Sequence, residues 1–103
     1  MLKLKLNYSL KIFQDSFDER FLNALDVYVN TVPRNEKTNT NEIIWCLDNS
    51  KEFKNVTLYF LGLELNNKII GYAEIAFLKR TRYINIDYLA IEKKYRTHSA
   101  LYT

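Results

Sequence analysis

The sequence predicts an α+β domain, in the order β-α-α-β-β-β-(α), whose mostly antiparallel central sheet carries helices on both faces. Three observations predict this class. The spacing of apolar residues changes along the chain from the period of a strand to that of a helix and back again. Two long runs of strand-forming residues meet at an Asn-Asn pair, which is typical of a hairpin turn. Both runs are apolar on either face, which indicates a sheet covered on two sides.

The first half of the chain is expected to hold one strand and two helices. Residues 2–8 alternate leucine or tyrosine with polar residues, which is the pattern of a half-buried strand. Ser16 stands three residues before Glu19, the spacing of a capping box, and apolar residues then recur at helical intervals up to the single proline. A polar loop over 34–41 leads into a second helix, for which Asn39 is the expected N-cap.

Two strands of the second half are expected to form a hairpin. The runs 57–65 and 68–78 are aromatic and apolar, and they are separated by Asn66 and Asn67. Asparagine tolerates positive φ, so this pair favours a two-residue turn. Gly71 lies inside the second run, where a glycine indicates a β-bulge or the close approach of another group.

A third strand is expected over 82–91, followed by the charged loop 92–96 and the first turn of a helix at 99–103. Strict alternation assigns the strand's residues to two faces. One face would hold Tyr83, Asn85, Asp87, Leu89 and Ile91, and the other Ile84, Ile86, Tyr88 and Ala90.

Composition limits the partners. A length of 103 residues suits one small domain, and the net charge of +3 is too small to indicate a nucleic-acid partner by itself. The charge is uneven, because residues 79–103 hold six basic and two acidic side chains, a local charge of +4. Such a stretch is either a solvated face or a surface for an anionic group. No apolar run reaches membrane-spanning length and no signal peptide is evident, so we expect a cytoplasmic protein without a membrane partner.

The single cysteine, Cys46, cannot form an internal disulfide, which favours a reducing compartment. It lies in an apolar helical run, so we expect it to pack rather than to act as a nucleophile. With one histidine in addition, the chain lacks the residues for a Cys/His metal site, and no metal is expected.

The last third of the chain carries a more specific pattern. A hairpin with Gly71 in its second strand precedes a strand that ends in Leu89, Ala90 and Ile91, then comes the charged turn, then a helix start. This order resembles the GNAT acyltransferase superfamily, in which the fourth strand ends in Leu-Ala-Val and Arg/Gln-x-x-Gly-x-Gly/Ala opens the next helix. The preceding strand and two helices match as well. The resemblance spans nearly the whole chain but only the N-terminal part of the family's domain, so residues 1–103 are expected to form a single, incomplete acyl-CoA N-acyltransferase fold.

The resemblance implies acetyl-CoA as cofactor. Backbone groups of Leu89, Ala90 and Ile91 would pair with the pantetheine arm. A helix N-terminus and the loop before it suit the pyrophosphate. The implied loop positions are Arg96, Thr97, His98, Ser99, Ala100 and Leu101. The family's glycine positions hold Ser99 and Leu101 in this sequence, and the family's fifth strand and fourth helix lie beyond the stretch that the resemblance covers.

Acyl transfer to an amine needs a base, and two strand carboxylates are candidates, Asp87 and Glu74. The other interpretation of each is an ordinary sheet carboxylate paired with Arg80, Arg82 or a lysine. The implied function is an acetyl-CoA-dependent N-acetyltransferase acting on a primary amine of a small molecule or protein, or the N-terminal, cofactor-binding fragment of such an enzyme, inactive alone. The alternative is a non-catalytic domain of this fold that associates through its exposed sheet edge, as a homodimer or with the missing C-terminal half. A small nucleic-acid binder is a weaker third option.

Overall fold

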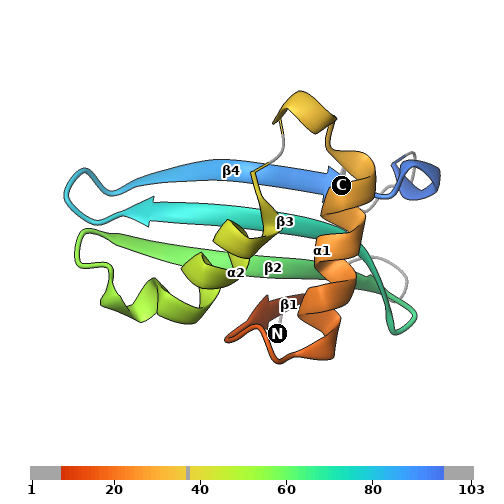
Figure 1. Cartoon of the computed structure of the whole chain (residues 1–103), viewed down its shortest axis with the longest axis horizontal. Coiled ribbons are helices and arrows are strands. Elements are labelled where there is room, and N and C mark those ends of the chain that lie inside the picture. Colours follow the sequence, from red (N-terminus) through yellow and green to blue (C-terminus); the bar gives the residue numbers. More distant parts are fainter. Residues whose placement is uncertain (1–7, 37, 97–103) are drawn as a thin grey trace.

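Four antiparallel strands form one sheet, and two helices lie against it (Figure 1). This computed structural model describes residues 8–36 and 38–96. The elements are β1 (Tyr8–Phe13), α1 (Glu19–Thr31), α2 (Thr40–Asn49), β2 (Val56–Leu65), β3 (Lys68–Leu78) and β4 (Tyr83–Ile91), with short 3₁₀ turns at Arg34–Glu36, Ser50–Glu52 and Lys93–Tyr95. The predicted order is confirmed from α1 to β4, and a strand precedes α1 as expected, but β1 also covers residues 9–13, which the sequence did not assign to a strand. The helix expected at 99–103, and the strand expected at 2–8 except for Tyr8, fall outside the described residues.

The helix starts follow from local hydrogen bonds. Asp18 caps α1 by accepting a hydrogen bond from the Arg20 amide at 2.9 Å. The predicted capping box at Ser16 is therefore wrong. Ser16 instead donates from its amide at 2.8 Å and from its hydroxyl at 2.6 Å to the Asp48 carboxylate, which joins the start of α1 to the end of α2. Asn39 caps α2 as predicted.

The hairpin between β2 and β3 confirms the prediction from the Asn-Asn pair. Asn66 and Asn67 have φ values of 51° and 67°, which asparagine adopts at a lower cost than most residues. Gly71 marks a close approach, as expected. A Cβ added there would stand 2.6 Å from Ile91 Cδ1 and 3.2 Å from the Ala90 carbonyl oxygen. The glycine therefore allows β3 and β4 to lie close together at this point.

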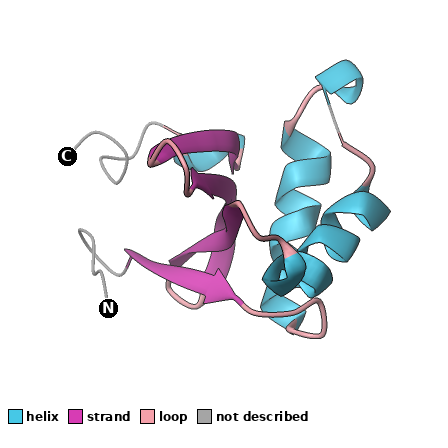
Figure 2. Ribbon diagram, turned by 90° about the vertical axis from the view of Figure 1, so that its left-hand side faces the viewer, coloured by secondary structure: helices cyan, strands magenta, loops and turns pink. Residues whose placement is uncertain are grey.

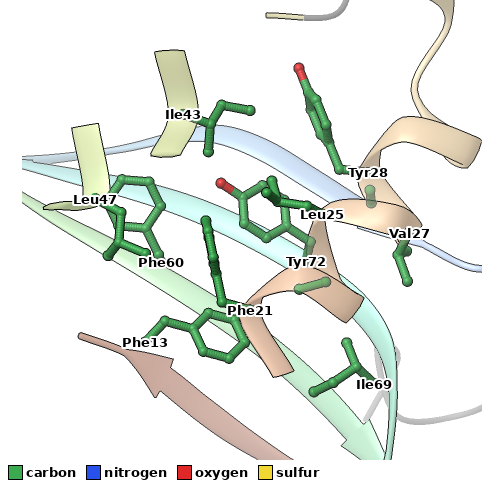
Figure 3. Packing of buried hydrophobic residues seen from close by; sticks show 12 residues of the cluster. Phe13, Phe21, Leu25, Val27, Tyr28, Ile43, Leu47, Phe60, Ile69 and Tyr72 are labelled. Carbon is green, nitrogen blue, oxygen red and sulfur yellow. The ribbon is translucent and has the colours of Figure 1, made fainter. Parts of the chain in front are cut away.

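Both helices lie on one face of the sheet, as Figure 2 shows. The described residues thus show helical cover on one face, and the further helix expected at 99–103 lies outside them. The main core fills the space between the sheet and the helices (Figure 3). Its buried members are Phe13, Phe21, Ala24, Leu25, Val27, Tyr28, Ile43, Leu47, Phe60, Ile69, Tyr72 and Ala90. A smaller buried cluster of Tyr8, Leu63, Ile70 and Ile91 lies apart from it.

A β-bulge interrupts the pairing of β4 with β3. Glu74 is opposite Tyr88 and Ile75 is opposite Ile86, so Asp87 has no partner residue on β3. The bulge shifts the alternation by one residue, and the predicted division of this strand into faces is wrong beyond it. Tyr88 and Ala90 pack against the main core, whereas Ile91 belongs to the smaller cluster. Asp87 itself lies on the helix side, opposite Ile84 and Ile86 as predicted.

Candidate active site

A cavity of about 310 Å³ opens between α2, the chain that leads into it, and strands β3 and β4. It is lined by Thr38, Glu42, Ile43, Cys46, Glu74, Asp87 and Tyr88. The structure thus brings together the two carboxylates that the sequence proposes as bases. They reach the same cavity because Ile75 is opposite Ile86, so the adjacent positions Glu74 and Asp87 lie side by side on the helix side of the sheet.

Glu74 has the electrostatic environment of a group that exchanges protons near neutral pH. Its partial burial, together with the adjacent Asp87 carboxylate, raises the pKa of Glu74 to about 7. The Tyr72 hydroxyl donates a hydrogen bond to Glu74 Oε1 at 3.1 Å and opposes part of this rise. Near pH 7 the Glu74 carboxyl therefore exists in both protonation states, as a general base requires.

The alternative interpretation, that these are carboxylates in ordinary ion pairs, finds no support among the described residues. Their ion pairs join Lys11 to Asp18, Arg20 to Glu64, and Lys68 to Glu92. Neither cavity carboxylate takes part in one of them. Asp87 instead accepts a hydrogen bond from the side-chain amide of Asn85 at 2.6 Å. The negative charge of the pair is thus left without a cation beside it within this part of the chain.

Aromatic hydroxyls fix one wall of the cavity. The Thr38 amide donates to the Tyr28 hydroxyl at 2.6 Å, and the Thr38 hydroxyl hydrogen-bonds that of Tyr88. The Tyr28 ring meets the rings of Tyr88 and Tyr72 edge-on, with centroids 5.1 Å and 5.7 Å apart. Figure 3 shows Tyr28 on α1 and Tyr72 on β3 within the core. These contacts fasten the chain between the two helices to β4, next to Asp87.

Tyr28, Thr38 and Tyr72 belong to the site but were not among the residues that the sequence predicts for it. One signal was present for Tyr72, since it precedes Glu74 by two positions in a predicted strand and so shares its face. Nothing local connects Tyr28 with Tyr88, which are sixty residues apart and meet only when α1 packs on the sheet.

Cys46 lines the cavity without the character of a nucleophile. Its side chain is half-buried and packs against the main core, in line with its predicted packing role. Burial, and then the negative charges of Glu74 and Glu42, raise the pKa of the Cys46 thiol. The thiol therefore stays protonated at neutral pH.

A second cavity, of about 570 Å³, adjoins the first at Asp87 and Tyr88, which line both. Its other lining residues are Thr31, Val32, Pro33, Leu89 and Arg96. Arg96 is held in place, because its Nε donates to the Ile91 carbonyl oxygen at 3.0 Å. Together the two cavities follow β4 from the carboxylate pair to a fixed guanidinium.

Only some of the proposed cofactor-binding residues are among those that the structure describes. Leu89 and Arg96 line the second cavity, while the side chains of Ala90 and Ile91 are buried. Thr97, His98, Ser99, Ala100 and Leu101 fall outside the described residues. Among the described strands β4 pairs only with β3, so backbone groups along its outer side face no other described strand.

Within residues 8–36 and 38–96, no three His, Cys, Asp or Glu side chains are grouped so that they could hold a metal ion. No helix in the same ranges is long and apolar enough to cross a membrane. Comparison with family models, with curated proteins and with solved structures found no match to this chain in any of the three.

Proposed function

We propose that the chain is an acetyl-CoA-dependent N-acetyltransferase of the GNAT type, or the cofactor-binding N-terminal part of one, acting on a primary amine. One observation carries the proposal. The Glu74 and Asp87 carboxylates occupy a cavity that adjoins, at Asp87, a second cavity leading along β4 to Arg96. A base for an amine and a cation for a phosphate thus stand at opposite ends of one path.

The carboxylate pair would serve the amine. A primary amine is protonated at neutral pH and must lose a proton before its nitrogen can attack a thioester carbonyl. Glu74, with a pKa of about 7, accepts that proton, and the negative charge of Asp87 attracts the ammonium form into the cavity. Asp87 and Tyr88 line both cavities, so an amine bound beside Asp87 would lie next to a cofactor bound in the second cavity.

The outer side of β4 and the segment after it would hold the cofactor. Acetyl-CoA supplies the acetyl thioester when bound. Backbone amides and carbonyls of residues 89–91 would pair with the amide groups of the pantetheine arm, as one strand pairs with another. Arg96, oriented by its hydrogen bond to Ile91, would contact a phosphate, with Lys93 and Lys94 adding positive charge nearby.

Coenzyme A titration followed by amide chemical shifts and hydrogen exchange tests this proposal. We expect saturable binding, with protection concentrated over residues 89–101 and weakened by Arg96→Gln. Lys51→Gln is the matched control, because it removes one exposed positive charge at a distant 3₁₀ turn and should leave binding unchanged. Failure of coenzyme A to protect any of residues 89–101 would contradict the proposal.

A second candidate function is a non-catalytic domain of this fold that associates with another chain through its sheet. It is favoured by the position of β4 at the edge of the described sheet. The two candidates differ in the test above, because a purely associating domain has no reason to bind coenzyme A saturably or to depend on Arg96 for it.

A further inference from the structure

The start of β2 forms an open edge of the sheet, because β2 extends past the end of β1 (Figure 1). The pairing of β1 with β2 stops at Phe13 and Phe60, whereas β2 pairs with β3 from Val56 onward. Within the part of the chain that the structure describes, residues 56–59 therefore have a strand on one side only. An open edge is a template on which an extended chain can add a further strand.

The alternation of β2 determines which backbone groups point outward at this edge. The Lys79 amide donates to the Asn55 carbonyl oxygen at 3.0 Å, so the backbone groups of Asn55 point toward β3. Along an antiparallel strand, successive residues direct their N–H and C=O groups to opposite sides. Val56 and Leu58 consequently direct theirs away from β3, to the side on which β1 has already ended. Two donors and two acceptors of the strand ladder are thus presented there.

A cavity of about 330 Å³ lies beside this edge. Leu58 packs against the main core, so Leu58 and Val56 point to the helix side of the sheet, while Thr57 and Tyr59 point to the helix-free face. A strand added at the edge would place every second side chain on the helix side, within the cavity. Most of the wall is apolar, as ligand pockets usually are. The described lining residues are Ile12, Phe13, Gln14, Leu47, Ser50, Lys51, Phe53, Val56, Thr57, Leu58, Tyr59 and Lys79.

The charge of this cavity is opposite to that of the candidate active site. Asp87 lines both cavities of that site, whereas the described residues that line this one include two lysines and no Asp or Glu. Neither Lys51 nor Lys79 forms an ion pair with a described residue. Lys79 follows β3 directly and lies opposite Asn55, at the end of the open edge that is farther from β1. That end therefore suits a carboxylate.

We infer that this edge binds an extended peptide antiparallel to β2, in line with β1, with its C-terminal carboxylate beside Lys51 and Lys79. A peptide of this direction begins near Phe13 and runs toward the lysines. Backbone hydrogen bonds to Val56 and Leu58 provide affinity, and the side chains that enter the cavity provide specificity. Among described residues, the cavity shares none of its lining with the two cavities of the candidate active site, so this inference goes beyond the proposed function and does not depend on it.

A synthetic peptide, acetyl-Thr-Leu-Thr-Val with a free carboxylate, tests the inference when titrated into the isotope-labelled chain. Its leucine and valine would lie opposite Leu58 and Val56 and enter the cavity. We expect saturable amide shifts over residues 56–59 and around the cavity. Lys79→Gln should weaken binding about threefold, and amidation of the peptide should weaken it similarly. Arg34→Gln is the matched control, because it removes one exposed positive charge from a 3₁₀ turn outside the cavity, and it should leave binding unchanged.

Two N-methylated peptides separate strand pairing from loose apolar contact. Methylation of the leucine nitrogen removes the N–H that faces Leu58, and should weaken binding about tenfold. Methylation of the second threonine nitrogen removes an N–H that points away from β2, and should leave the affinity unchanged. Equal weakening by the two methylations, or no amide shift over residues 56–59, overturns the inference. A loss of affinity in Arg34→Gln as large as that in Lys79→Gln also overturns it, because binding would then follow the overall charge.

Discussion

The hydroxyl of Tyr72 lies 3.1 Å from Glu74 Oε1, and both side chains rise from the same side of β3 toward the helices. The tyrosine is fully buried, and the carboxyl it contacts lines a cavity. Burial and the charge of Glu74 raise the pKa of the Tyr72 phenol, so it remains a hydrogen-bond donor throughout the physiological range. One buried donor therefore sets part of the proton affinity of the candidate base.

Tyr72→Phe should raise the pKa of Glu74 above its value of about 7, because the hydrogen bond that favours the carboxylate form is lost while burial and Asp87 remain. The carboxyl carbon of Glu74, followed by NMR across a pH series, reports this directly. Tyr59→Phe, on the helix-free face, is the control and should leave the titration unchanged. A pKa that stays the same or falls in the Tyr72 variant would contradict the role given to this hydroxyl.

Glu74 should also make stability depend on pH. The folded state raises the pKa of Glu74 from its usual 4.5 to about 7, so between these values the folded chain holds a proton that the unfolded chain has released. The stabilisation is complete below about pH 4.5 and is lost as pH rises through about 7. We expect Glu74→Gln to flatten this decline in the free energy of unfolding, measured by urea titration at closely spaced pH values.

The other ionisable groups facing Glu74 are Asp87, Glu42, Cys46, Tyr72 and Tyr88. Asp87→Asn therefore provides a second arm for the same measurement. It should shift the decline toward lower pH, since removing the neighbouring negative charge makes ionisation of Glu74 easier. If the free energy of unfolding falls with pH as steeply in Glu74→Gln as in the unaltered chain, another group causes the fall.

Local patterns predicted the elements well because each has a local cause. Asn66 and Asn67 determine the hairpin turn through their positive φ, and Asn39 determines the start of α2. The errors have a non-local cause. Ser16 fits a capping box in sequence, yet Asp48 at the end of α2 offers it two hydrogen bonds across the interface between the helices. No pattern near Ser16 indicates that partner.

The bulge at Asp87 explains why the site was predicted only in part. Period-two alternation correctly separated Asp87 from Ile84 and Ile86, but one unpaired residue reverses every assignment after it. Leu89 consequently lies on the helix-free face, and Tyr88 turns inward to meet Tyr28. Sequence spacing identifies both carboxylates and the face of Asp87, whereas the pairing of β3 with β4 that brings Asp87 beside Glu74 is a long-range register that spacing does not encode.

The Tyr28 hydroxyl should control local opening of the chain between α1 and α2. It accepts the Thr38 amide at 2.6 Å, so Tyr28→Phe leaves that amide without its acceptor. We expect faster hydrogen exchange at Thr38 and a loss of about 1 kcal/mol in the free energy of unfolding. Tyr88→Phe is the comparison, because it removes the contact to the Thr38 hydroxyl but keeps the amide bond. Equal exchange at Thr38 in the two variants would contradict this assignment.

Gly71 should be intolerant of even one added methyl group. Its φ is not positive, so alanine brings no backbone strain, and any loss of stability comes from contact with Ile91 Cδ1 at 2.6 Å and the Ala90 carbonyl oxygen at 3.2 Å. We expect Gly71→Ala to lower the free energy of unfolding by about 1–3 kcal/mol, the usual cost of overpacking. Ile91→Val removes the Cδ1 atom, so in that background the same substitution should cost less. Denaturant unfolding of the unaltered chain, the two single variants and the double variant gives the coupling free energy between the two positions. Additive effects would show that the Ile91 side chain is not what excludes alanine.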